Sequence, residues 1–160
     1  MFDFKIEGMY ELLKNLGSLG EVPQKHVTAS VRKGMNIVLR QARATAPRDT
    51  GDLKRGIVSV GEVASNKGKK VYRIVFDRGM NDVFQKPVKS VGMSGSPKAK
   101  DPAYYPISQE YGYFAKNGRY IPGFRFGRNA FKSKLPDAKK AIIETMKKKT
   151  DEEISKRGLK

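Results

Sequence analysis

The sequence lacks cysteine and tryptophan, and it contains a single histidine, His26. Without cysteine there can be no disulfide and no thiolate metal site, and a reducing cytosol suits such a chain. One histidine cannot hold a metal by itself. We therefore interpret His26 as a surface residue of a helix, and we expect neither a metal nor a cofactor.

Long apolar runs are also absent, so no segment is expected to cross a bilayer, and the start, Met1 to Phe4, does not resemble a secretory signal. Acidic residues are scarce, with 16 against 33 Lys and Arg and a net charge of +17. Such a charge implies a polyanion or an acidic protein surface as partner, and nucleic acid is the commonest polyanion. We expect a soluble intracellular product without a membrane partner.

Grouped catalytic side chains are missing as well. The segment 92–98 superficially resembles a phosphate-binding loop, but it lacks the Gly-Lys-Ser/Thr ending and no strand leads into it. A two-metal nuclease needs several carboxylates around ions about 4 Å apart. The spacing of the loop carboxylates does not predict this: Asp77, Asp82, Asp101 and Glu110. We therefore expect that the protein is not an enzyme. A metal-dependent nuclease is the weakest of the functional hypotheses, behind a structural protein and a nucleic-acid-binding protein.

The clearest pattern present is an amphipathic helix from Pro23 to Thr45. Its apolar residues recur every three or four positions, at Val27, Val31, Met35, Val38 and Ala42. The opposite side is basic, with Arg32, Arg40 and Arg43. Pro47 ends the helix, because the residue before a proline avoids the helical region.

Strands and a second helix are expected further along. Alternation predicts a hairpin from 56–63 and 71–76. Periodicity vanishes over 77–102, which we interpret as a long loop that is mobile in the free protein. Residues 104–114 mix strand and helix, and a final helix begins near Arg128 and restarts at Pro136, with 147–160 frayed. The fold class is α+β: one domain, with a small, mainly antiparallel sheet packed by two long helices.

Aromatic residues gather between residues 104 and 126, interleaved with arginines. Such a cluster can bind single-stranded nucleic acid by stacking. It can equally fill the core where sheet and final helix meet and provide anchors for a subunit interface. We favour the second interpretation. The aromatic residues are Tyr104, Tyr105, Tyr111, Tyr113, Phe114, Tyr120, Phe124 and Phe126.

Two short motifs carry a resemblance that spans nearly the whole chain. The first, Ala46-Pro47-x-x-Thr50-Gly51-x-Leu53, follows the long helix; the second is a tyrosine pair with Glu110-x-Gly112, before Phe124 and Ala130. Their order resembles the gene-product-ten family of long-tailed bacteriophages, the tail-completion or head–tail joining proteins. The stretch from Pro122 to Ala130 departs from the family's Pro-Phe-Leu-x-Pro-Ala, and the 77–102 loop is longer than usual.

The resemblance implies a structural virion protein of the phage neck, made in the bacterial host cytoplasm. It would form a ring of six copies around the DNA path and contact a neighbouring neck ring and the tail tube. The alternative is a basic nucleic-acid-binding protein without catalytic activity. At Thr50-Gly51 the residues alone predict local capping by Asp49 or Thr50 and a positive φ at Gly51, which turn the chain sharply from helix to strand.

The expected site residues form two sets. The motif positions have structural roles by resemblance: Pro47, Thr50, Gly51, Leu53, Tyr105, Glu110, Gly112, Phe124 and Ala130. The basic residues are candidates for subunit or non-specific DNA contacts: Arg32, Arg40, Arg43, Lys86, Lys89, Lys98, Lys100, Arg119, Arg125 and Arg128.

Overall fold

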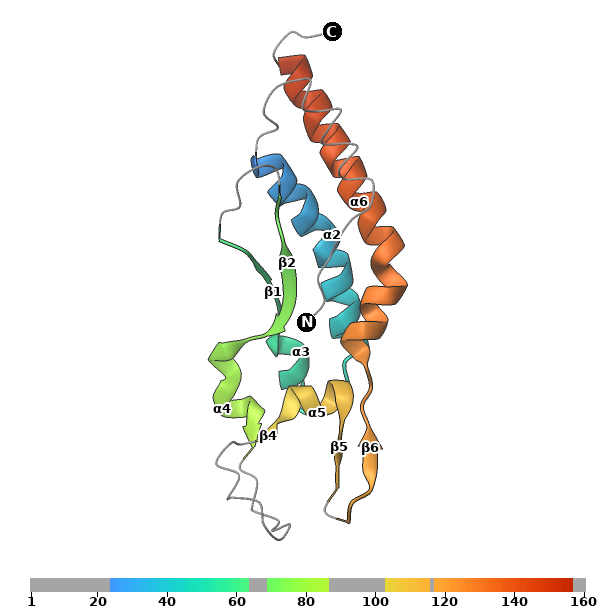
Figure 1. The fold of residues 1–160 in the computed structure, drawn as a ribbon. Helices are drawn as coiled ribbons and strands as arrows, with labels where there is room; N and C mark the ends of the chain where they lie inside the picture. Colours follow the sequence, from blue (N-terminus) through green and yellow to red (C-terminus); the bar gives the residue numbers. More distant parts are fainter. Residues whose placement is uncertain (1–23, 64–68, 87–102, 116, 157–160) are drawn as a thin grey trace.

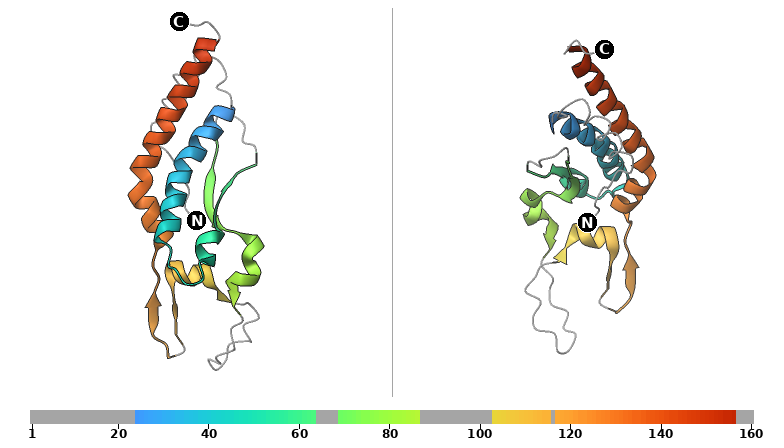
Figure 2. Two further views of the ribbon diagram at one scale, coloured as in Figure 1. Left: turned by 180° about the vertical axis from the view of Figure 1, so that it is seen from behind. Right: turned by 45° about the horizontal axis from the view of Figure 1, so that its top comes forward.

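The computed structural model describes residues 24–63, 69–86, 103–115 and 117–156. Within these ranges the fold is α+β, as predicted. The long helices are α2 (Gln24–Thr45) and α6 (Phe126–Lys156), and α2 lies between α6 and a β-hairpin (Figures 1 and 2). The sequence also predicts a short strand from Phe2 to Ile6 and a short helix opened by Gly8; both of these, and Asp101, lie outside the described residues.

Helices α2 and α6 run antiparallel and share most of the core (Figure 1). The predicted stripe of α2 is buried, with Val27, Val31, Met35 and Val38 packed against Ala138 and Met146 of α6. Gly34 marks a close approach, because a Cβ there would lie 2.5 Å from Ile142 Cγ1 and 2.8 Å from the Ala138 carbonyl oxygen. A larger residue at position 34 would therefore force the helices apart.

Helix α6 corrects one prediction, because it begins at Phe126 and passes through Pro136 without restarting. Proline removes one helical hydrogen bond, here the one to the Lys132 carbonyl. Pro136 and Lys132 are both exposed, so water can satisfy that group. Burial of Ala130, Ala138 and Ile142 on α2 favours one continuous helix. The expected fraying from residue 147 stays a prediction, although the helix extends to Lys156.

The expected hairpin is confirmed as β1 (Ile57–Gly61) and β2 (Tyr72–Phe76). The strands are antiparallel, with Ile57 opposite Phe76 and Gly61 opposite Tyr72. The described residues hold two further antiparallel pairs in place of a single sheet. Strand β3 (Gln85–Lys86) pairs with β4 (Ala103–Tyr104), and β5 (Gly112–Phe114) pairs with β6 (Tyr120–Pro122).

The segment expected to begin the long loop is ordered as far as Lys86, which corrects the predicted start at Asp77. It forms a 3-10 turn, η1 (Arg78–Met80), helix α4 (Asn81–Phe84) and then β3. The physical reason is Phe84, which is fully buried with its ring 6.3 Å from Phe76 and 5.9 Å from Tyr104, both edge-on. Residues 87–102 lie outside the described part, and their mobility stays a prediction.

Candidate assembly interface

Glu110 is a buried carboxylate that joins α5 (Tyr105–Tyr111) to the start of α6. Its two carboxylate oxygens accept hydrogen bonds from the backbone N–H of Gly127 at 2.9 Å and of Arg128 at 3.1 Å. The first N–H groups of a helix have no partner within it, and the positive end of the helix dipole favours an anion. Glu110 thus caps α6, which explains the physical role of the Glu-x-Gly motif.

Backbone contacts strengthen the same junction. The Phe124 N–H donates to the Gln109 carbonyl at 2.8 Å, and the Arg125 N–H donates to the Glu110 carbonyl at 3.0 Å. Arg125 has a φ of 51°, in the left-handed region, where a residue with a Cβ costs about 1–2 kcal/mol. The connection into α6 is therefore held by contacts that offset this strain.

Gly112 fixes the direction of the β5–β6 hairpin at its base. Its φ is 96°, and a Cβ there would lie 2.7 Å from Tyr120 Oη and 2.8 Å from the Gly123 nitrogen. A Cβ on Gly123 would in turn lie 2.5 Å from the Glu110 carbonyl oxygen. The two backbone segments approach too closely to leave room for side chains. The direction in which the β5–β6 hairpin extends from α5 and α6 is therefore fixed.

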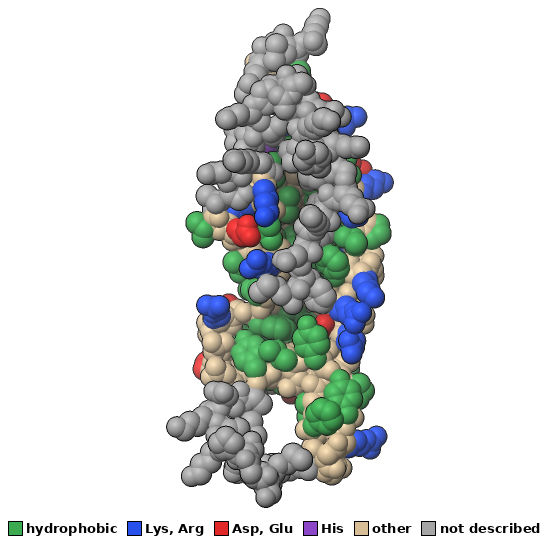
Figure 3. All heavy atoms as spheres, in the orientation of Figure 1, with side chains coloured by type: hydrophobic (Ala, Val, Ile, Leu, Met, Phe, Trp, Pro, Cys, Tyr) green, Lys and Arg blue, Asp and Glu red, His purple; other side chains and the backbone are tan. Residues whose placement is uncertain are grey.

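Beyond this base, the hairpin leaves large apolar side chains exposed. Phe114 is 75% exposed and Phe124 60%, and the rings of Phe114 and Tyr120 lie 5.3 Å apart. We call residues 111–124 the aromatic hairpin; its exposed members are Tyr111, Tyr113, Phe114, Tyr120, Ile121 and Phe124. Figure 3 shows apolar side chains gathered over this hairpin and over the neighbouring α4–α5 region.

The aromatic hairpin and the turn after it contain cations but no carboxylate over residues 111–128. Arg119, Arg125 and Arg128 are all exposed there. Contiguous exposed apolar surface on a soluble protein marks interaction sites, and Tyr, Phe and Arg are enriched in protein–protein interfaces. Of the predicted aromatic cluster, Phe126 is buried in the core, whereas the hairpin members are available for a partner.

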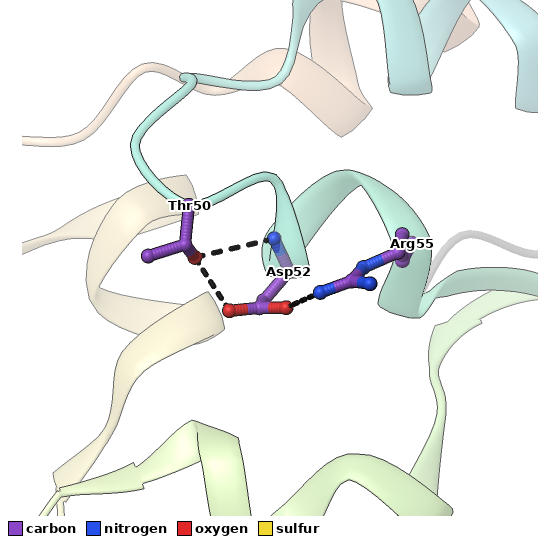
Figure 4. A network of polar contacts seen from close by, with 3 residues as sticks. All are labelled: Thr50, Asp52 and Arg55. Carbon is purple, nitrogen blue, oxygen red and sulfur yellow. Dashed lines mark hydrogen bonds and ion pairs between the residues drawn. The ribbon is translucent and has the colours of Figure 1, made fainter.

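The Thr50-Gly51 turn connects α2 to the β1–β2 hairpin through a short helix, α3 (Asp52–Gly56). The prediction that this turn leads directly into a strand is therefore wrong. Gly51 has the expected positive φ, 88°. Figure 4 shows Thr50 Oγ1 directed at Asp52, which also pairs with Arg55. Leu53 is buried beside Ala42 and Ala130, so this motif is anchored in the core.

Tyr104 and Tyr105 are half-buried beside carboxylates. Burial raises the pKa of Tyr105, and the charges of Asp49 and Asp52 raise it further. Burial also raises the pKa of Tyr104, against an opposing effect of Arg78. Both phenols therefore keep their protons at neutral pH. Pro47, the remaining motif residue, is half-buried at the end of α2.

The predicted basic contacts fall into four groups, and the first is the exposed set of Arg119, Arg125 and Arg128 described above. Arg32 and Arg40 are exposed on α2, a helix without any acidic residue. Arg43 has a structural partner, because its Nε donates to the Ile57 carbonyl at 2.8 Å. The side chain of Lys86 and all of Lys89, Lys98 and Lys100 lie outside the described residues.

The interpretation of His26 as a surface residue is wrong. It is 8% exposed, and its Nε2 lies 3.7 Å from Glu153 Oε2. The reason is the length of α6, which reaches the first turns of α2. Sequence reasoning also missed Gly34 and Phe84; a glycine inside a strong helical pattern was a usable signal for the first.

The scattered carboxylates have separate surroundings. Asp77 caps η1, Asp82 lies on α4 and Glu110 caps α6. Within the described ranges, no three His, Asp or Glu side chains are grouped as metal ligands. The helices described there include none with the length and hydropathy needed to span a membrane.

The described residues thus form a core of two helices and the β1–β2 hairpin, and this core carries the exposed aromatic hairpin. Residues 10–80 match a family described as "Bacteriophage HK97-gp10, putative tail-component". The match includes α2, α3, β1 and β2 and confirms the gene-product-ten resemblance over that segment. The matched family is one of structural phage tail components. No curated protein and no solved structure matches the chain.

Proposed function

We propose that this protein is a structural component of the phage neck that joins the DNA-filled head to the tail as part of an oligomeric ring. The observation that carries the proposal is the family match over residues 10–80. The aromatic hairpin supports it, because large exposed apolar side chains held in a fixed direction suit a lasting contact between virion proteins.

The charge distribution supports a position around DNA. Helix α2 exposes Arg32 and Arg40 and carries no carboxylate, within a chain of net charge +17. A ring that encloses DNA must not repel phosphate, and scattered Lys and Arg provide weak attraction that does not depend on sequence. Any DNA contact of this kind would be non-specific.

The test is removal of the gene from the phage that encodes it. We expect DNA-filled heads and finished tails to accumulate side by side in electron micrographs, and the wild-type chain supplied in trans to restore joining. Antibody labelling should place the protein between head and tail. Normal infectious particles without the protein would overturn the proposal.

The second candidate is a free-standing nucleic-acid-binding protein, which the net charge favours. The two candidate functions are distinguished by measuring the affinity of the purified protein for a DNA duplex at increasing salt concentrations. A dedicated binder loses affinity steeply as salt rises from a tight starting value. We expect weak binding that disappears at moderate salt. Tight binding at physiological salt, with head–tail joining unaffected by deletion of the gene, would favour the alternative.

A further inference from the structure

A groove with a volume of about 160 Å³ lies between β2 and α6, and α2 contributes to its lining. Residues 74–76 of β2 line it, but only Ile57 of β1, so the groove runs along β2. Its polar lining includes Glu110, whose two carboxylate oxygens already accept hydrogen bonds from the backbone of α6. Its apolar lining includes Met35, Ala42, Ile74, Phe76, Phe126 and Phe131. The groove therefore suits an apolar occupant.

The size of the groove matches one aromatic ring. A cavity of about 150 Å³ with an aliphatic and aromatic lining is large enough to bind benzene. Three side chains of the lining, Ile74, Phe76 and Phe131, are only partly buried. A ring placed in the groove would cover apolar surface on both β2 and α6, which is favourable.

The outer edge of β2 offers backbone hydrogen bonds beside the same groove. The Asp77 N–H donates to the Gly56 carbonyl at 2.7 Å, so these two residues form a bonded pair of the ladder. Bonded pairs alternate along antiparallel strands, and the backbone groups of Tyr72, Ile74 and Phe76 therefore point away from β1. Among the described strands, none pairs with that edge. Another strand can be added there.

The outer edge of β1 is less available. The backbone carbonyl of Ile57 accepts a hydrogen bond from Arg43 Nε at 2.8 Å. Arg43 belongs to the last turn of α2, so the helix already occupies this end of β1. An added strand is therefore expected at β2.

Residues 2–6 have the pattern of a strand that fits this place. Phe2, Phe4 and Ile6 alternate with Asp3 and Lys5. Because successive side chains of a strand point to opposite faces, the three apolar residues would share one face and the two charged residues the other. Such a strand brings two phenylalanine rings to a groove that has room for one.

The chain is long enough to place residues 2–6 there. Helix α2 begins at Gln24, and Val27 in its first turn belongs to the same cluster as Tyr72 at the start of β2. The linking residues 7–23 can span roughly 50 Å when extended, whereas all of α2 is about 33 Å long. A segment of the same chain is also present at a high effective concentration, which favours it over a segment from a second copy.

We propose that residues 2–6 form a third strand on the outer edge of β2, and that the ring of Phe2 or Phe4 fills the groove between β2 and α6. The occupant is thus a segment of the same chain. Asp3 and Lys5 lie on the face of the sheet that points away from α2. This assignment holds whether or not the protein acts in the phage neck.

The absence of cysteine allows a direct test, because two introduced thiols can pair only with each other. Ile74→Cys is combined with Phe2→Cys or with Phe4→Cys, from the apolar face of the segment. The matched controls combine Ile74→Cys with Asp3→Cys or with Lys5→Cys, from its charged face. The full-length variants are oxidised at low protein concentration. Intact mass spectrometry and non-reducing electrophoresis then separate a disulfide within one chain from a disulfide between chains.

We expect a disulfide within one chain for at least one of the two phenylalanine positions, in a yield several-fold above both controls. The reason is that Cβ atoms on opposite faces of a sheet point apart and cannot be bridged without backbone movement. Equal yields from the two faces, or no disulfide from either, would overturn the proposal. A disulfide formed mainly between chains would assign the groove to a second copy, and the proposal would be wrong.

Benzene provides a second test, which needs no thiol. The variant Phe2→Ala with Phe4→Ala should have a lower melting temperature than the wild type, and benzene should raise it, because a ligand that binds only the folded state stabilises that state. The control Asp3→Ala with Lys5→Ala, like the wild type, should show no such rise. An equal rise in the wild type would show that the groove is open in the full chain. That result, or an unchanged melting temperature of the phenylalanine variant, would contradict the proposal.

Discussion

The α2–α6 core and the aromatic hairpin use apolar residues in opposite ways. In the core, Val27, Val38, Ile142 and Met146 are almost completely buried, and their spacing follows the helical period. In the hairpin, residues as large as Phe114 and Phe124 remain exposed on a two-stranded element that could not fold alone. The comparison indicates that the first region specifies the fold, and that the second is presented by it.

The largest expected effect concerns Phe84, which tests where the core ends. Phe84→Ala should lower the free energy of unfolding by about 3–5 kcal/mol, because it removes a fully buried ring between Phe76 and Tyr104. Val83→Ala is the matched control at an exposed neighbouring residue, and it should lower the free energy of unfolding by about 0.5 kcal/mol or less. Urea denaturation measures both. Equal small effects would show that residues 77–86 lie outside the core.

The junction between the two regions should respond next. Gly112→Ala adds a Cβ at a φ of 96° that meets the carbonyl of Ile121 and the nitrogen of Gly123, so we expect a loss of at least about 2 kcal/mol. Gly118→Ala is the control, because Gly118 also has a positive φ, 78°, but has open space around it. Its cost should be near 1 kcal/mol. If thermal unfolding shows that Gly118→Ala destabilises the protein more than Gly112→Ala, the close approach of the backbones at Gly112 and Gly123 is contradicted.

A smaller effect is expected at the cap of α6. Glu110→Ala leaves the Gly127 and Arg128 N–H groups without an acceptor, at a cost of about 1–2 kcal/mol. The control is Glu144→Ala, which removes an exposed carboxylate from the middle of α6. It should change the free energy of unfolding by less than about 0.5 kcal/mol. Hydrogen exchange should accelerate at Gly127 and Arg128 in the first variant alone. Unchanged protection of these amides would rule out the cap.

Local patterns predicted the local structure well. The spacing from Val27 to Ala42 gave the correct helix, alternation gave the hairpin, and Thr50-Gly51 predicted the positive φ. Each of these signals is contained within a single continuous stretch of the chain. The α+β class followed from the same signals, because two amphipathic helices and a hairpin must bury their apolar faces together.

Long-range contacts explain what the sequence did not predict. Glu110 finds its partners seventeen and eighteen positions later, which no periodicity records. Phe84 lies in a segment without periodicity, and its burial depends on Phe76 and Tyr104. Pro136 suggested that the last helix restarts there, but the packing of α6 on α2 keeps the helix continuous. His26 is covered because the far end of α6 brings Glu153 against the start of α2, a contact between residues far apart in the sequence.

The central claim is that the aromatic hairpin serves assembly and contributes little to the fold, and one complementation experiment tests it. The variant Phe114→Ser with Phe124→Ser changes the two most exposed hairpin aromatics. We expect a melting temperature within a few degrees of the wild type, yet no rescue of head–tail joining in a phage that lacks the gene. Full rescue by this folded variant would contradict the account, as would its failure to fold.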